Sequence, residues 1–359
     1  MVKSLKKGPA SVEFRNVVKR YGTVAAVDDV SFKIEPGTLV TLLGPSGCGK
    51  TTTLRLVAGL EIATEGSILI GGEDVTRLSA ADRDVSMVFQ SYALFPHMNV
   101  IDNVSYGPSV QGLPKEQARA MAREKLALVG LKGYDLRLPS ELSGGQQQRV
   151  AVARALTLEP QVLLFDEPLS NLDAKLRRQV REDIRDLQRS LNLTVVYVTH
   201  DQQEALAVSD RVIVMSNARI AQAGKPRELY EAPASLFVAD FMGDANIVDA
   251  DIDAVADGVA QTRIGDALLA LAARGLAPGK AKVAIRPEAL LLKDASGSAA
   301  ALAGRISKAS YLGTHMEYTI ATKLGDLFVV DKKVAEPRAP GGEIWLEFAN
   351  AGIALVPRG

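Results

Sequence analysis

Short apolar runs alternate with amphipathic stretches over residues 11–236 of the chain. The runs at 39–43, 162–166 and 195–199 have the length and continuous apolar character of buried strands. Residues 172–191 instead repeat their apolar positions every three or four residues, as one face of a helix does. Strands that alternate with helices in this way predict an α/β domain built on a parallel sheet.

The pattern changes after residue 237, where short strands are separated by glycine and proline. The expected strands are 281–288, 303–307, 316–320, 326–330 and 343–347. Such a series predicts a small all-β domain of the OB-barrel type. We therefore expect three parts along the chain: a loose extension over 1–10, an α/β domain over 11–236 and an all-β domain over 237–359.

Composition narrows the classes of protein to consider. The 359 residues include 42 basic and 42 acidic side chains, so no net charge favours nucleic acid or an anionic membrane surface. No apolar run approaches the roughly 18 residues that cross a bilayer. The amino end lacks the apolar stretch of a signal peptide. The one cysteine, Cys48, excludes an internal disulfide.

A glycine-rich loop follows the expected strand at 39–43 and precedes a helical stretch. It fits the template G-x-x-x-x-G-K-[ST], and its residues are Gly44, Pro45, Ser46, Gly47, Cys48, Gly49, Lys50, Thr51 and Thr52. The glycines let backbone N–H groups surround an anion at the helix N-terminus. Lys50 then reaches the β- and γ-phosphates, and the hydroxyl of Thr51 lies on Mg²⁺. The loop predicts that the chain binds a nucleoside triphosphate with Mg²⁺.

Two carboxylates stand at the end of the apolar strand at 162–166. Asp166 is its last residue and Glu167 follows directly. At the carboxyl end of a parallel strand beside a phosphate-binding loop, Asp166 can hold Mg²⁺ through water. Glu167 is then placed to polarise an attacking water, which makes it the candidate general base.

The segment Leu142–Gln146 reads Leu-Ser-Gly-Gly-Gln. Ser143 with Gln146 three residues later predicts a capping box that opens a helix. That box does not account for two consecutive glycines. Gly144 and Gly145 permit a phosphate to approach the helix N-terminus, where Ser143 donates a further hydrogen bond. This pentapeptide resembles the signature motif of ATP-binding cassette (ABC) ATPases.

The resemblance implies roles for further residues. Tyr21 matches the aromatic residue on which adenine stacks, and Gln90 matches the glutamine that contacts Mg²⁺ and the attacking water. His200 matches the histidine that contacts the γ-phosphate. The segment Ser170–Asp173 resembles the loop that couples the two sites of a dimer. The implied catalytic residues are Glu167, His200 and Gln90, and the implied metal ligands are Thr51, Gln90 and Asp166.

The resemblance also implies an assembly. ABC ATPases pair head to tail and hold each ATP between the loop of one subunit and the signature motif of the other. The residues implied to act on the partner's ATP are Ser143, Gly144, Gly145, Gln146 and Asp173. The apolar segment 91–100 matches the region that docks one of two transmembrane permease subunits. In the alternative, Leu94, Phe95 and Met98 pack into a helical subdomain.

The end of the chain narrows the resemblance to importers. Arg286–Glu288 and Tyr311–Gly313 resemble segments of the TOBE domain that follows the ATPase domain in importer subunits. The implied protein works at the cytoplasmic face of the cell membrane, together with a solute-binding protein outside it. The alternative is a soluble ABC ATPase that acts on DNA or ribosomes. DNA-repair relatives insert a long heptad region between the loop and the signature motif, whereas only about ninety residues without such a repeat separate them here. Ribosome-acting relatives usually carry two cassettes, whereas this sequence has one glycine-rich loop of this type.

The transported solute is a separate question. The whole chain resembles the branch of importer ATPases that serves ferric iron, polyamines and 2-aminoethylphosphonate, with sulfate and sugars as alternatives. Ser209–Arg211 and Gly243–Asn246 favour the first three solutes. Because such an ATPase does not touch its cargo, the sequence leaves the choice among them open.

Overall fold

The computed structural model describes residues 8–294 and 301–357. Its contacts divide the chain into two compact units, with the division between Pro226 and Arg227. The sequence places the domain boundary at 236/237, whereas the segment from Arg227 onward makes its contacts within the second unit. The first seven residues of the expected extension, 1–10, lie outside the described part of the chain.

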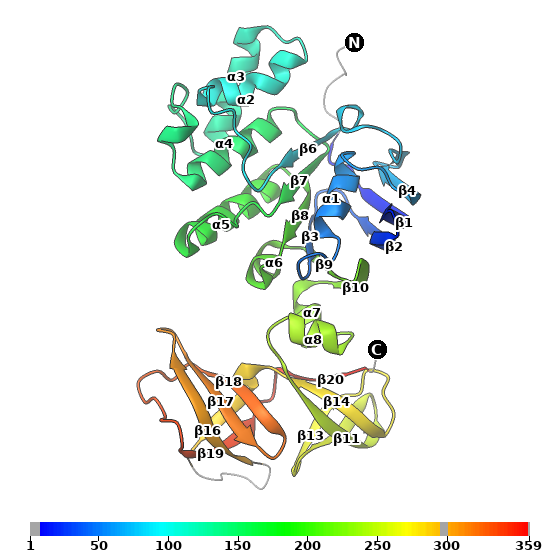
Figure 1. Ribbon diagram of the computed structural model, residues 1–359, viewed down its shortest axis with the longest axis vertical. Helices are drawn as coiled ribbons and strands as arrows, with labels where there is room; N and C mark the ends of the chain where they lie inside the picture. The colour runs from blue at the N-terminus through cyan, green and yellow to red at the C-terminus, as the bar shows by residue number, and fades with distance from the viewer. Residues whose placement is uncertain (1–7, 295–300, 358–359) are drawn as a thin grey trace. The chain divides into compact units, whose positions relative to one another are not determined.

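A six-stranded sheet crosses the first unit in the order β10-β9-β3-β8-β7-β6 (Figure 1). Its strands are β3 Leu39–Leu43, β6 Val85–Val88, β7 Val162–Asp166, β8 Thr194–Thr199, β9 Arg211–Ser216 and β10 Arg219–Gly224. All neighbours pair in parallel except β10, which is antiparallel to β9. The expected parallel α/β sheet is therefore confirmed, with the three apolar runs as β3, β7 and β8.

Alternate residues of the central strands enter two different hydrophobic cores, because successive side chains of a strand point to opposite faces. In β7, Val162 and Leu164 pack in a core shared with α1, Lys50–Ala58. Leu163 and Phe165 pack in a second core, which α4 and α5 cover. The continuous apolar run of β7 follows from burial on both faces.

An antiparallel sheet adds to the first of these cores. Its order is β2-β1-β4-β5, and its strands are β1 Val12–Tyr21, β2 Val24–Ile34, β4 Glu65–Ile70 and β5 Glu73–Asp74. The rings of Phe14 and Phe32 stack across β1 and β2 with their centroids 4.5 Å apart. Apolar and polar residues alternate in Val12–Arg15 and Val30–Ile34, which is typical of such an antiparallel flanking sheet.

The remaining helices of the first unit form two groups. A helical subdomain consists of α2 Val100–Val110, α3 Lys115–Leu128 and α4 Gly144–Leu156, which share a small apolar core. The others are α5 Ala174–Ser190 and α6 Gln202–Val208. The apolar stripe expected over 172–191 lies in α5, where Val180 and Ile184 are buried against the second core.

Among its described residues, the second unit is all-β apart from a turn of 3-10 helix at Pro287–Ala289 and two short α-helices. These are α7 Pro226–Glu231, whose first residue ends the first unit, and α8 Leu236–Phe241. One sheet has the order β13-β12-β11-β14-β20 and the other β15-β19-β16-β17-β18. The strands are β11 Asn246–Ala256, β12 Val259–Ile264, β13 Ala267–Ala272, β14 Gly279–Ile285, β15 Leu290–Lys293, β16 Leu302–Tyr311, β17 Met316–Thr322, β18 Gly325–Asp331, β19 Glu343–Phe348 and β20 Ile353–Val356. The inner faces of the sheets share one core, which confirms the all-β class.

The five expected strands correspond to β14, β16, β17, β18 and β19. Sequence reasoning missed β11–β13, β15 and β20. β11 is rich in alanine and aspartate, and half of β13 is alanine; both residue types have low strand propensity. Among the described residues, no helix combines the length and apolar character needed to cross a membrane.

Candidate nucleotide-binding site

The glycine-rich loop joins β3 to α1 and wraps closely against neighbouring backbone. A Cβ added at Gly49 would lie 2.3 Å from the carbonyl oxygen of Ala26, and one at Gly44 would lie 2.3 Å from that of Met215. Gly49 is also left-handed, with φ 103°, at the N-cap of α1. Only glycine satisfies both conditions. The loop is therefore fixed in a shape that directs the first N–H groups of α1 toward its hollow.

The side chain of Lys50 lies back over this loop. Its Nζ donates to the carbonyl oxygens of Gly44 at 2.8 Å and Pro45 at 2.9 Å, and the residue is buried. Its third partner among the described residues is Sγ of Cys48 at 3.9 Å. Because none of these three partners is a carboxylate, the ammonium can still form a charge-assisted hydrogen bond with an anion. Thr51, the next residue, places its Oγ1 3.4 Å from Oδ1 of Asp166. The loop and the end of β7 therefore meet.

Asp166 and Glu167 have different surroundings at that end of β7. Burial raises the pKa of Asp166, and the neighbouring Glu167 charge raises it further. Glu167 has a left-handed backbone with φ 45°, and its N–H donates to Val198 of β8 at 3.0 Å. Its Oε2 lies 3.0 Å from Nδ1 of His200, whose side chain is 59 % exposed. Strained conformations of this type concentrate at functional sites.

Gln90 joins the same group through the loop after Glu167. Its Nε2 donates to Oγ of Ser170 at 3.1 Å, and its carbonyl accepts from Asn171 at 3.1 Å. Ser170 in turn donates to the carbonyl oxygen of Glu167 at 3.0 Å. The structure thus brings Gln90, Glu167 and His200 together from three separate strand ends.

Tyr21 stands apart from this group. It ends β1 with 48 % of its surface exposed, and the ammonium of Lys19 lies 4.8 Å from its ring centroid. Partial burial and a hydrogen bond with Glu61 raise the pKa of its phenol. Among the described residues, no hydrogen bond or ion pair links Tyr21 to the loop. Its exposed ring leaves room for a stacked base.

The residues of the Leu-Ser-Gly-Gly-Gln segment form the start of α4. Ser143 N–H donates to Oε1 of Gln146 at 3.0 Å, and Gln146 N–H donates to Ser143 Oγ at 3.4 Å, which is the expected capping box. A Cβ added at Gly145 would lie 2.8 Å from Leu176 Cδ1 of α5. Close packing on α5 is therefore a reason for glycine that the sequence did not reveal.

Asp173 has the equivalent capping position on α5, since its Oδ1 accepts from Leu176 N–H at 3.0 Å. The first turns of α4 and α5 thus lie side by side. Across the described part of the chain, no hydrogen bond or ion pair connects this pair of helix starts with the glycine-rich loop.

A small cavity of about 50 Å³ beside His200 contains residues that sequence reasoning did not place in the site. Its lining includes Glu167, Thr199 and His200 together with Arg177 and Glu204. Glu204 is 3 % exposed and accepts from Thr199 Oγ1 at 2.7 Å. Burial is the main cause that raises its pKa. The sequence signal that could have identified Glu204 is a glutamate on the apolar face of the helix that follows His200.

The segment 91–100 borders an apolar groove of about 500 Å³. Ala93 and Phe95 line it together with Phe89 and Tyr106, whose side chains are partly exposed. Leu94 instead packs against the cores of the first unit, as the alternative interpretation expects. In this segment, Leu94 therefore packs inside the unit, while Ala93 and Phe95 line the open groove.

Two family models match the chain: an ABC transporter model over residues 27–170 and a TOBE domain model over residues 283–356. The "Fe(3+) ions import ATP-binding protein FbpC 1" of Rhizobium meliloti (strain 1021) is 60% identical, covering 97% of this chain and 98% of that protein. The FbpC of Pasteurella multocida (strain Pm70) is 49% identical over 95% of this chain and 97% of its own length.

Solved structures are similar to the first unit. The dimeric post-hydrolysis state of the ATP-binding cassette MJ0796 bound to ADP and Pi has a TM-score of 0.53 and 31% identity, and it covers 60% of this chain and 99% of that one. CbiO1 of Clostridium perfringens has a TM-score of 0.58 and 26% identity, over 62% of this chain and 90% of its own. The chain belongs to the ATP-binding subunits of ABC importers, an ATPase family, and carries a C-terminal TOBE domain.

Proposed function

We propose that this protein hydrolyses ATP to drive the import of ferric iron through a membrane transporter. The observation that carries the proposal is the meeting of Thr51 with Asp166, and of Glu167 with His200, at neighbouring strand ends. The choice of ferric iron rests on full-length relatives that are named for Fe(3+) import. Residues 11–236 are proposed as the nucleotide-binding domain and 237–359 as a regulatory domain.

ATP is proposed to bind over the glycine-rich loop, with Tyr21 against the base. Lys50 exchanges its two carbonyl partners for the terminal phosphates, because a charged partner forms stronger hydrogen bonds. Thr51 at the start of α1, Asp166 at the end of β7 and Gln90 after β6 would supply oxygen atoms, which is the ligand chemistry that Mg²⁺ prefers. When bound, Mg²⁺ neutralises charge that develops on the phosphates.

Glu167 is proposed as the general base for the attacking water. Its contact with His200 Nδ1 fixes the carboxylate beyond the end of β7, next to Asp166, which contacts Thr51 of the glycine-rich loop. His200 then presents its other ring nitrogen toward the γ-phosphate. Glu167 has a Brønsted role, since it accepts the proton of the water as the oxygen attacks phosphorus.

The second half of each site is proposed to come from a second copy of the chain. Two adjacent helix starts carry Ser143, Gly144, Gly145, Gln146 and Asp173, and no hydrogen bond or ion pair in the described part of the chain links them to their own glycine-rich loop. Helix N-termini favour anions, so this cluster suits a partner's phosphates. The dimeric MJ0796 cassette supports this arrangement for the present chain.

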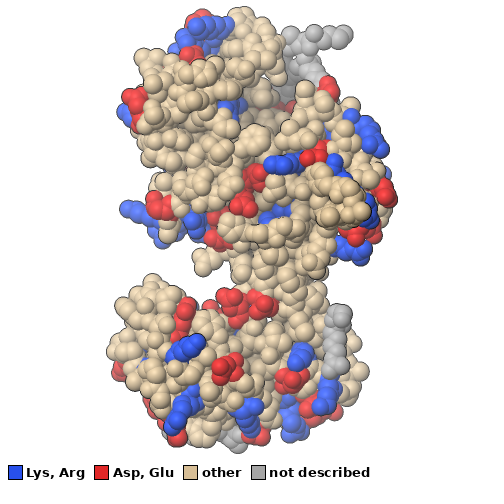
Figure 2. Space-filling view, viewed as in Figure 1, with Lys and Arg blue, Asp and Glu red and all other residues tan. Residues whose placement is uncertain are grey.

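The groove beside 91–100 is proposed to receive a permease subunit. An open apolar groove with aromatic walls is typical of a helix-docking surface. Two permease subunits would hold the ATPase at the cytoplasmic face of the membrane, and an external solute-binding protein would deliver the iron. On the face drawn in Figure 2, basic and acidic side chains are intermixed over each unit, which offers nucleic acid no continuous basic surface.

The test is uptake by source cells whose chromosomal copy carries Glu167→Gln. Labelled ferric iron, putrescine, 2-aminoethylphosphonate, sulfate and a disaccharide are supplied in parallel. We expect ferric iron uptake alone to fall. Loss of a different solute would replace iron as the cargo, and unchanged uptake of all five would contradict the transport proposal.

A further inference from the structure

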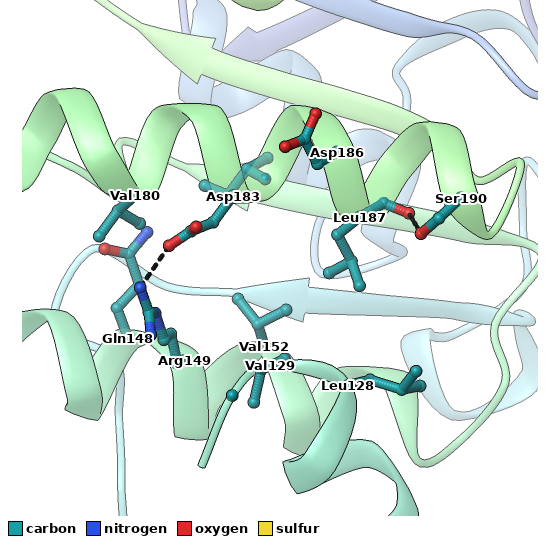
Figure 3. Close-up of a pocket in the computed structure, with 12 residues that line it drawn as sticks. Leu128, Val129, Gln148, Arg149, Val152, Val180, Asp183, Asp186, Leu187 and Ser190 are labelled. Carbon is teal, nitrogen blue, oxygen red and sulfur yellow. Dashed lines mark hydrogen bonds and ion pairs between the residues drawn. The ribbon is translucent and has the colours of Figure 1, made fainter.

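A second cavity lies between α4 and α5, away from the nucleotide loop (Figure 3). Its volume is about 380 Å³, which is within the range of small-molecule sites. Aliphatic side chains supply most of its wall: Leu128, Val129, Val152, Val180, Ile184 and Leu187. The end of α3 closes one side, while α4 and α5 form the other two.

Gln148 of α4 stands at this wall with unmet hydrogen-bonding capacity. The residue is fully buried, and neither Nε2 nor Oε1 has a partner among the described residues. A buried amide without partners is destabilising. Gln188 on α5 provides the contrast, since it is also buried, yet its Nε2 donates to Gly37 and Leu193 and its Oε1 accepts from Arg185. The two buried glutamines therefore differ: Gln188 has partners for its amide, and Gln148 has none among the described residues.

The other polar side chains at the wall are already satisfied. Arg149 and Asp183 form an ion pair at 2.6 Å, drawn as the dashed line between the helices in Figure 3. Ser190 donates to the carbonyl of Leu187 at 3.1 Å. Asp186 is exposed to water. The polar group left without a partner is thus one carboxamide at the edge of an apolar cavity. Its Nε2 and Oε1 are covered in this structure, so the side chain must turn to present them to an occupant.

A carboxamide presents a donor and an acceptor side by side. Its complement is another group with the same pair, such as an amide or a lactam. The terminal torsion of glutamine is broad, so rotation directs Nε2 and Oε1 toward an occupant. We propose that this cavity binds a small, mainly apolar molecule that carries an amide or lactam group, through paired hydrogen bonds with Gln148.

An occupant of this cavity would contact α4, the helix that begins at the Leu-Ser-Gly-Gly-Gln segment. Gln148 is on the same helix as Ser143, little more than one turn further along. The first turns of α4 and α5 touch, as the 2.8 Å approach between a Cβ at Gly145 and Leu176 shows. A molecule that fills the cavity between α4 and α5, beyond these first turns, fixes the angle between the two helices. Resting on the proposed function, we expect occupancy to slow ATP turnover without weakening ATP binding to one subunit.

Two matched probes test the binding. Caprolactam carries an N–H beside its carbonyl, whereas N-methylcaprolactam has lost the donor at nearly the same size. Affinities for the full-length protein are measured by protein-observed NMR titration. We expect N-methylcaprolactam to bind at least tenfold more weakly. Equal affinities, or no binding of caprolactam, would overturn the proposal.

Matched variants locate the site. Gln148→Leu removes the carboxamide and should weaken caprolactam binding at least tenfold. The control Gln117→Leu makes the same change on an exposed position of α3 and should bind as the parent does. Thermal unfolding reports whether Gln148→Leu folds. If it does not, Val180→Phe, which fills the cavity, is used in its place and should also weaken caprolactam binding. Undiminished binding in the folded variant would sink the assignment.

ATP turnover tests the link to α4. Saturating caprolactam should lower turnover at least twofold in the parent and leave Gln148→Leu unchanged. Binding without any change in turnover would overturn that link. Because the titration needs no ATPase activity, a chain that bound caprolactam but hydrolysed no ATP would contradict the proposed function and not the cavity site.

Discussion

Glu167 adopts a conformation that residues other than glycine and asparagine rarely occupy, with φ 45°. Its N–H is held by Val198 and its carboxylate by His200. Both contacts lie at the end of β8, the strand beside β7. The strained backbone therefore sets the direction of the carboxylate, which agrees with a single proposed chemical role.

Replacement of Glu167 by glutamine tests that role. The amide keeps the size of the side chain but cannot accept a proton. Hydrolysis should fall by about 10²–10⁴-fold, the usual contribution of a general base, while the Kd for ATP changes little. Single-turnover phosphate release and equilibrium ATP binding measure the two effects. Hydrolysis at the parental rate would show that another group takes the proton.

Glu204 makes a prediction about pH. Burial raises its pKa in the folded protein above the ordinary value of 4.5. As pH rises from 4.5 through that raised pKa, the unfolded chain releases its proton first, so the free energy of unfolding falls. Glu204→Gln removes this decrease and keeps a hydrogen-bonding group for Thr199. Urea unfolding over this pH range measures both proteins, and identical slopes would contradict the prediction.

At the scale of the helix pair, glycine at position 145 has two possible reasons: close packing on α5 and the approach of a phosphate to the start of α4. Gly145→Ala places a Cβ 2.8 Å from Leu176, and such overpacking should destabilise the protein by about 1–3 kcal/mol. Adding Leu176→Ala relieves the contact. Denaturant unfolding measures the stability of both variants. ATP hydrolysis is then measured for the double variant. If its stability is restored but its hydrolysis remains slow, Gly145 is needed for the partner's phosphate as well as for packing on α5.

Individual elements differ in how far the sequence predicts them. The nucleotide loop is predictable because its template specifies backbone shape locally, and the structure confirms a strand before it and a helix after it. β13 was missed because its alanines and leucines resemble a helix and become a strand only through pairing with β12. Arg177 is one of the charged residues in the amphipathic stretch 172–191, where the sequence predicts solvent exposure, yet it lines the cavity beside His200. That contact depends on long-range packing, which no local pattern contains.

At the scale of the whole molecule, a substitution at Tyr106 tests whether the apolar groove couples ATP hydrolysis to transport. Its ring lines the apolar groove and is 42% exposed, so Tyr106→Glu should leave folding intact while placing a charge in the docking surface. Uptake should fall at least tenfold, with ATP binding by the purified subunit unchanged. Cell uptake and nucleotide titration are the two measurements. Normal uptake would move the permease contact elsewhere.

The alternation of β7 between two cores limits how the chain can change over time. A substitution in this strand alters one core at one position. Loss or gain of a single residue before Asp166 would instead exchange the side chains of both cores and displace the two carboxylates together. Insertions and deletions should therefore be confined to the loops, while the number of residues in β7 stays fixed.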